Sequence, residues 1–168
     1  MKSQLWLATS LFPLALVFAG NALAEDQQNT VMVTVSVTIN ASPCEINNNQ
    51  NIDVDFGDSV ITTDVMAGTV EKTINYMLDC SNADTAKTLK MRISGTGADF
   101  NADLLQTSIP ELAIKLKADG TDFPLNTDLT LATTTSKPNL VAVLQGKPGA
   151  RLPTGGFTAG ATMTVDYQ

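Results

Sequence analysis

The sequence predicts an all-β protein built as a β-sandwich. Three observations favour this fold class. Several short runs alternate apolar and polar residues with a period of two, which is the pattern of a strand buried on one face. Glycine, proline and asparagine turns separate these runs, and no helical periodicity persists long enough to predict a substantial helix. Two cysteines far apart in the sequence add a long-range cross-link, as in many secreted sandwiches.

The first element along the chain is an expected signal peptide, residues 1–24. Lys2 gives a positive start, the apolar run from Leu5 to Phe18 is short for a membrane span, and Ala22-Leu23-Ala24 has the small-x-small form of a cleavage site. Cleavage before Glu25 leaves 144 residues, the size of one domain. Nine Lys and Arg then face 17 Asp and Glu, a net charge of −8 that argues against a nucleic-acid partner.

The expected strands follow in order, each with apolar residues at alternate positions or as a short apolar run. They are residues 31–39, 52–56, 70–80, 89–93, 112–117, 140–144 and 157–167. The asparagine-rich stretch 47–51 is expected to form a polar turn after the first cysteine. Residues 81–86 and 98–105 lack the alternation, so we expect irregular loops there.

Cys44 and Cys80 are the two cysteines of the chain. An exported protein meets an oxidising compartment, where an even pair of cysteines indicates a disulfide. In the chain-entropy model, closing a loop of this length contributes roughly 3–4 kcal/mol to stability.

The sequence offers no arrangement for catalysis, for a cofactor or for a metal. It contains no His, so neither a Ser-His-Asp nor a Cys-His arrangement can be built, and the two cysteines are expected to bind each other rather than zinc. Asp53, Asp55 and Asp58 lie close together but lack the ligand spacing of a calcium loop, and we interpret them as solvated side chains. We therefore expect a protein that is not an enzyme and carries no cofactor.

The C-terminal strand is the most informative segment. Every odd position from Phe157 to Tyr167 is apolar, the penultimate residue Tyr167 is aromatic, and Gly155 is the fourteenth residue from the end. These features resemble the C-terminal motif of chaperone–usher pilins of the type 1 and P pilus kind. In that family the strand pairs with a periplasmic chaperone, which holds the terminal carboxylate, here that of Gln168. The resemblance implies a chaperone and groove strand that comprises Gly155, Phe157, Ala159, Ala161, Met163, Val165, Tyr167 and Gln168.

A segment that begins polar and becomes valine-rich precedes the first cysteine. This order of extension, first strand and cysteine resembles that of pilins with a donor extension. The resemblance divides the chain into the signal peptide, a donor-strand extension over 25–38 and a pilin domain over 39–168. The apolar face of the extension, which would fill a neighbour's groove, consists of Val31, Val33, Val35 and Val37. Asp53-Val54-Asp55-Phe56-Gly57 and the partner cysteine Cys80 also resemble the family pattern.

The resemblance implies an incomplete immunoglobulin-like β-sandwich that lacks its last strand and is completed by donor-strand complementation. The chaperone would donate a strand first, and the next subunit's extension would replace it, which is β-augmentation. The implied partners are the periplasmic chaperone, an outer-membrane usher and neighbouring fimbrial subunits. The implied location is a fimbrium on the cell surface, reached through the periplasm, with a role in cell adhesion.

Two further questions stay open at this stage. An extension without a receptor-binding domain fits a shaft subunit, a tip adaptor or a terminator, and the asparagine-rich turn resembles the turns of minor adaptor subunits.

The alternative function is a self-contained secreted β-sandwich that binds a carbohydrate or a protein. Sugar sites favour exposed aromatic residues, however, and the only tryptophan, Trp6, lies in the expected signal peptide. A periplasmic enzyme is the third reading, which the missing His disfavours.

Overall fold

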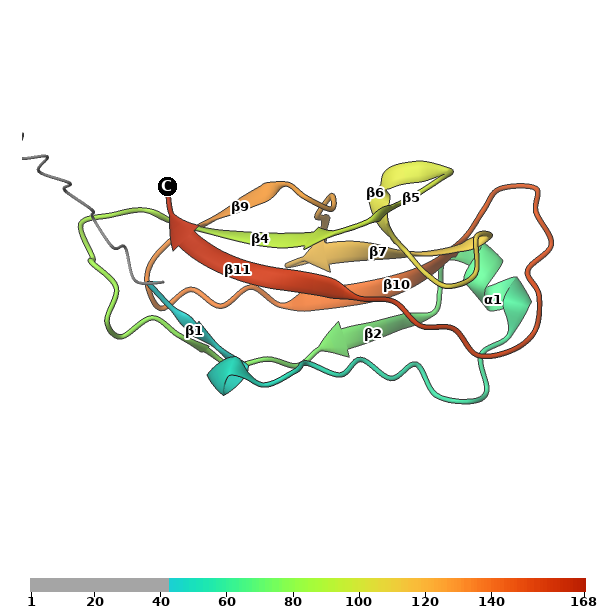
Figure 1. Ribbon diagram of the computed structural model, residues 1–168, viewed down its shortest axis with the longest axis horizontal. Helices are drawn as coiled ribbons and strands as arrows, with labels where there is room; N and C mark the ends of the chain where they lie inside the picture. The colour runs from blue at the N-terminus through green and yellow to red at the C-terminus, as the bar shows by residue number, and fades with distance from the viewer. Residues whose placement is uncertain (1–42) are drawn as a thin grey trace, which may run out of the picture. The chain divides into compact units, whose positions relative to one another are not determined.

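A computed structural model describes residues 43–168, and the expected signal peptide and donor extension lie outside this part of the chain (Figure 1). The described residues form short strands and very little helix. The strands are β1 (Glu45–Ile46), β2 (Glu71–Ile74), β3 (Leu78–Asp79), β4 (Leu89–Gly95), β5 (Gly97–Ala98), β6 (Asn101–Gln106), β7 (Leu112–Ala118), β8 (Thr121–Asp122), β9 (Asp128–Leu131), β10 (Leu140–Gly146) and β11 (Ala161–Tyr167). A 3-10 turn, η1 (Asn47–Asn49), follows β1, and a six-residue helix, α1 (Thr62–Ala67), precedes β2.

The strands form two main sheets and one small pair. One sheet has the order β2-β10-β7-β6-β5, with β8 paired to β7, and the other has the order β11-β4-β9. The small pair joins β1 to β3. All of these pairings are antiparallel, and the longest ladders match seven residues of β10 with β7 and seven of β11 with β4. The chain crosses between the two main sheets after β4, after β8, after β9 and after β10, as in a β-sandwich.

The core lies between the two main sheets. Alternate residues of β4, β7 and β10 are almost fully covered, as Met91 and Leu144 illustrate with no measurable exposure. They share one apolar cluster with Val165 of β11, so the two sheets pack face to face. The outward side chains are polar: Lys90 and Arg92 of β4 both form ion pairs with Asp128 of β9. The alternation of apolar and polar residues in the sequence therefore corresponds to the core-facing and solvent-facing sides of each sheet.

Several expected elements are confirmed, among them the strands in 89–93, 112–117 and 140–144 and the irregular loop over 81–86. The run 70–80 divides into β2 and β3, and the last strand begins at Ala161 rather than at Phe157. Residues 52–56 alternate as expected, but they form an extended segment outside any sheet of the described chain. The missing ladder matters for the site below.

The prediction of a loop over 98–105 was wrong, because β5 and β6 form a hairpin there. Leu105 enters the main core, whereas Leu104 packs with Ala98 on the other side of the sheet. Because both faces of the sheet are covered by apolar residues here, two leucines stand next to each other and the alternation of apolar and polar residues is lost. The sequence therefore gives no strand signal for β6. Gly97 permits the tight pairing, since a Cβ there would lie 2.6 Å from the carbonyl oxygen of Ala102.

Helix α1 is the one α-helix in the described residues, and it is too short to span a membrane. It ends at Gly68, whose left-handed φ of 67° closes the last turn with backbone bonds to Asp64 and Val65. Val65 is the residue that α1 buries in the core. The helix thus covers the core at the end of the sandwich where β10 finishes.

Candidate functional site

A long groove with a volume of about 1810 Å³ runs along the sandwich. One rim is the extended segment 50–60, and the other is the C-terminal stretch from Leu152 through β11. In Figure 1, β11 is drawn in red across the middle of the view, and the segment after β1 runs below it in blue-green. The floor is made of inward side chains from both main sheets: Ile93, Leu105, Ile114, Leu116, Ala142 and Leu144. The groove therefore gives access to the core of the protein.

The first rim begins at the asparagine turn η1. Asn47, Asn48 and Asn49 all have positive φ, between 49° and 58°, a left-handed conformation that asparagine tolerates better than most residues. The side-chain amide of Asn47 donates to the carbonyl oxygens of Gln50 and Asn51, at 3.2 and 3.0 Å. The asparagine-rich sequence thus encodes a tight left-handed turn that directs the chain from β1 along the groove.

Beyond this turn the first rim alternates in the way the sequence predicted. Ile52, Val54 and Phe56 are half-buried and line the groove, whereas Asp53 and Asp55 are exposed. The Asp55 carboxylate accepts a 2.7 Å bond from the backbone N–H of Gly57, where the φ of 82° turns the chain. The aspartates therefore act in solvent contacts and local turn formation, and the apolar side chains face the groove.

The second rim is β11 and the residues before it. Strand β11 pairs with β4 and, among the described residues, is the edge strand of its sheet. Met163 and Val165 point inward and cover the core, while Ala159 and Ala161 line the groove yet remain exposed. Exposed groove-lining residues mean that this part of the groove is open to solvent. Ahead of the strand, Thr158 is held by backbone and side-chain bonds with Ser108, at 2.8 and 3.0 Å.

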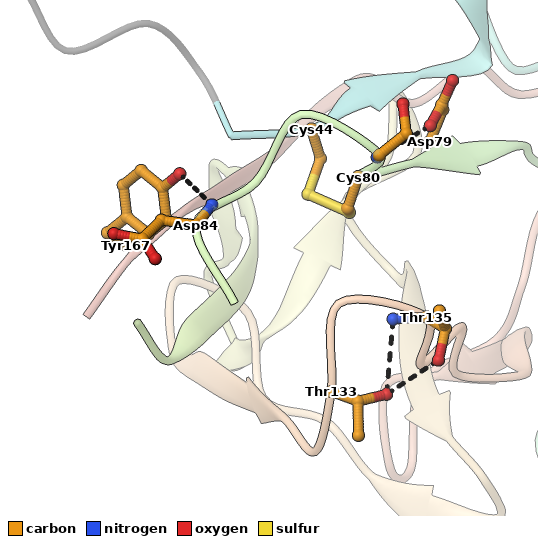
Figure 2. The surroundings of a disulfide bond; sticks show 8 residues. Cys44, Asp79, Cys80, Asp84, Thr133, Thr135 and Tyr167 are labelled. Atoms are coloured by element: carbon orange, nitrogen blue, oxygen red, sulfur yellow. Dashed lines mark hydrogen bonds between the residues drawn. A yellow bond between two sulfur atoms is a disulfide. The ribbon is translucent and has the colours of Figure 1, made fainter. Parts of the chain in front are cut away.

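The last two residues lie beyond the groove lining. The hydroxyl of Tyr167 accepts a 2.9 Å bond from the backbone N–H of Asp84 (Figure 2). The ammonium of Lys87 lies 4.8 Å from the centre of the tyrosine ring. The backbone N–H of Gln168 donates to Thr88, at 2.9 Å. Tyr167 therefore ties the end of β11 to the loop that follows the second cysteine, a role that the sequence pattern did not predict.

The predicted disulfide between Cys44 and Cys80 is confirmed, with 4.1 Å between the Cα atoms (Figure 2). Both cysteines are buried, and the bond joins the chain just before β1 to the end of β3. It fixes the start of the first rim at the same end of the sandwich as Tyr167. The groove thus has one strongly anchored end.

The structure brings six of the predicted C-terminal site residues to the groove: Gly155, Phe157, Ala159, Ala161, Met163 and Val165. The four donor valines fall outside the described residues, so their role stays a prediction. Sequence analysis missed the floor of the groove, including Leu105 and Leu116. The pattern identified most of these residues as apolar strand positions, but it did not indicate which core positions lie next to the gap.

The groove joins an apolar floor to a rim that is an edge strand. Its floor is aliphatic, and the aspartates along its first rim are exposed to solvent. Among residues 43–168, no group of three His, Cys, Asp or Glu side chains is placed to hold a metal. An apolar trough beside an edge strand can bind an extended chain through backbone pairing and alternate side chains.

Comparison with known proteins places this architecture in a family. The family model for fimbrial protein matches residues 33–168. The chain belongs to the fimbrial protein family. Among its relatives are two fimbrial-like proteins of Escherichia coli (strain K12): YfcQ is 34% identical over 141 residues, covering 81% of this chain and 86% of that protein, and YfcR is 33% identical over 130 residues, covering 75% and 74%.

Solved structures of pilus subunits share the fold of this fimbrial subunit. The P pilus rod subunit PapA matches with a TM-score of 0.59 at 22% identity, over 83% of this chain and all of that one. The P pilus adaptor subunit PapF matches with a TM-score of 0.52 at 25% identity, over 75% of this chain and 96% of that one. The sandwich is therefore the immunoglobulin-like fold of chaperone–usher pilus subunits, and both family and fold are those of structural proteins.

Proposed function

We propose that this fimbrial subunit is assembled by donor-strand exchange, with the groove between residues 50–60 and β11 as the acceptor site. The observation that carries the proposal is the groove itself, a solvent-open channel with an aliphatic floor that reaches the core beside an edge strand. A folded domain rarely leaves such a channel unfilled, since apolar surface in water costs about 25 cal/mol per Å². An inserted strand would cover the floor and extend the β11-β4-β9 sheet at the same time.

The donor in this proposal is the extension at residues 25–38 of a neighbouring subunit. Its valines at positions 31, 33, 35 and 37 share one strand face, the arrangement needed to fill a trough lined by alternate apolar residues. Since each subunit carries both a donor extension and an acceptor groove, the contact is head-to-tail and does not close. Such a contact produces a fibre.

Delivery and location follow from the same reasoning. A subunit with an open groove needs a temporary strand in the periplasm, which a pilus chaperone supplies before an outer-membrane usher passes the subunit to the growing fibre. The signal peptide over 1–24 starts this route, and the assembled fimbrium at the cell surface contributes to adhesion. A self-contained binding module would have a filled core, so the groove favours the subunit over that alternative.

Deletion of residues 25–38 tests the two roles separately. The shortened chain keeps the groove, so the next subunit can still donate a strand to it. Without its own extension it cannot donate to a subunit already in the fibre, so it should start a fibre but not join one. Immunogold electron microscopy of cells that produce the chain with its neighbouring fimbrial proteins would then show label at fibre ends only. Label along the fibre for both the full and the shortened chain would contradict donation by this extension.

A further inference from the structure

Two phenylalanines meet across the groove. Phe56 belongs to the first rim and Phe157 to the second, and their ring centres lie 6.0 Å apart with an angle of 47° between the ring planes. This distance and tilt fall within the range of attractive aromatic pairs. Both side chains are half-buried and pack against the main core cluster. The pair thus connects rims that belong to distant parts of the sequence.

The rims are anchored at one end and less constrained at the other. The disulfide Cys44–Cys80 and the bond from Asp84 to Tyr167 secure the end near the C-terminus. Towards the opposite end, residues 50–60 and 153–160 belong to no ladder within the described chain, although two bonds to Ser108 hold Thr158, the residue after Phe157. Phe56 lies in the first of these two unpaired segments, and Phe157 lies in the second.

Glycines adjoin both aromatic residues. Gly57 follows Phe56 with a φ of 82°, and Gly155 and Gly156 precede Phe157, the first of them with a φ of 131°. These positive φ values are readily available to glycine, and a glycine also leaves the neighbouring backbone freer to rotate. The chain therefore places both bulky rings next to glycines, in segments that no ladder restrains.

From this geometry we propose that Phe56 and Phe157 form a clasp that holds the rims together over the unfilled groove, and that the clasp must part before a strand can enter. The inference rests on the proposed strand donation, because the entering strand is what the clasp would regulate. A clasp protects the core from water while the groove is empty, and it slows uptake. Under this proposal Phe56 and Phe157 control the rate at which the donor strand enters, even if they make no contact with the bound donor.

The test compares the exported chain with Phe56→Ala, Phe157→Ala and the double variant. Phe100→Ala is the matched control, because Phe100 is also half-buried but packs with Ala98 and Leu104 away from the groove. The probe is a synthetic peptide of residues 27–38, whose incorporation is followed by native mass spectrometry over time. Binding of an apolar fluorescent dye to the unfilled chain provides a second readout that needs no donor.

We expect each single alanine variant to take up the peptide about two- to tenfold faster, the range that corresponds to the strength of an aromatic pair. The double variant should be no faster than the faster single variant, because the two residues act as one unit. Both single variants should bind more dye than the wild type, and Phe100→Ala should change neither readout. Phe157→Leu, which keeps an apolar side chain without the ring, covers the case in which an alanine variant fails to fold.

Unchanged uptake and unchanged dye binding in the alanine variants would overturn the clasp while leaving strand donation intact. Slower uptake would also overturn it, since the rings would then be part of the donor-binding surface. Additive effects in the double variant would show that the residues act separately, against the proposal. Increased dye binding without peptide uptake in any variant, the wild type included, would support the clasp and count against the proposed donor.

Discussion

Removal of the disulfide by the double substitution Cys44→Ser and Cys80→Ser should destabilise the subunit strongly. The bond closes a loop with a sequence separation of 36. Within this loop the described ladders are the two-residue pair of β1 with β3, while most of the rest is the groove rim, α1 and β2. The cross-link is therefore the main restraint on the first rim at its anchored end.

The chain-entropy model gives a loss of about 4 kcal/mol for a loop of this size. With the urea dependence usual for small domains, about 1–3 kcal/mol per molar, the midpoint of unfolding should fall by about 1.3–4 M. The assay is a urea melt of the oxidised wild type, the reduced wild type and the double serine variant. The reduced wild type and the variant should agree, because both lack the cross-link.

A loss below about 1 kcal/mol in both samples would refute this reasoning. It would mean that the unfolded chain is already compact between the two cysteines, or that the native bond stores strain that offsets the entropy gain. A loss in the variant alone would indicate that the serine hydroxyls, placed where the cysteines are buried, cause the damage.

Three other perturbations have defined outcomes. Burial first, and the charge of Asp119 second, raise the pKa of Tyr76 to about 12, so urea midpoints should fall between about pH 10 and 12, and Tyr76→Phe should reduce this fall. Arg92 first, then Lys90, hold the pKa of Asp128 at about 2, so stability should decline as pH falls from about 4 to 2, and Asp128→Asn should flatten the decline in an acid series of melts. Met91→Ala, at a fully buried position, should cost about 2–5 kcal/mol in a urea melt, and a loss under 1 kcal/mol would contradict the packing described.

The strands that make the core could be predicted because their environment repeats with the backbone. Positions 112, 114 and 116 are apolar and buried, and Lys115 and Lys117 alternate with them in the second half of the strand. The disulfide could be predicted from compartment and count alone. These inferences need only local periodicity and the chemistry of an oxidising environment.

The remaining features depend on pairings between distant segments. The period-two pattern of residues 52–56 predicts a strand, yet a ladder also requires a neighbour, and the described chain places the groove there. Leu104 and Leu105 serve opposite faces of a sheet, which erases the local pattern of β6. The contact between Phe56 and Phe157 joins residues about 100 positions apart, and no local rule relates them.

The most direct test of the account is a urea melt of the mature chain, alone and with residues 27–38 repeated after Gln168 through a short flexible linker. A matched control carries the same fusion with threonine in place of the four valines, which keeps the shape but places hydroxyls on the apolar face. The account predicts a large rise in the unfolding midpoint for the valine fusion and little rise for the threonine fusion. An unfused chain that is already stable and monomeric, with no gain in the unfolding midpoint from either fusion, would contradict the claim that the sandwich lacks a strand.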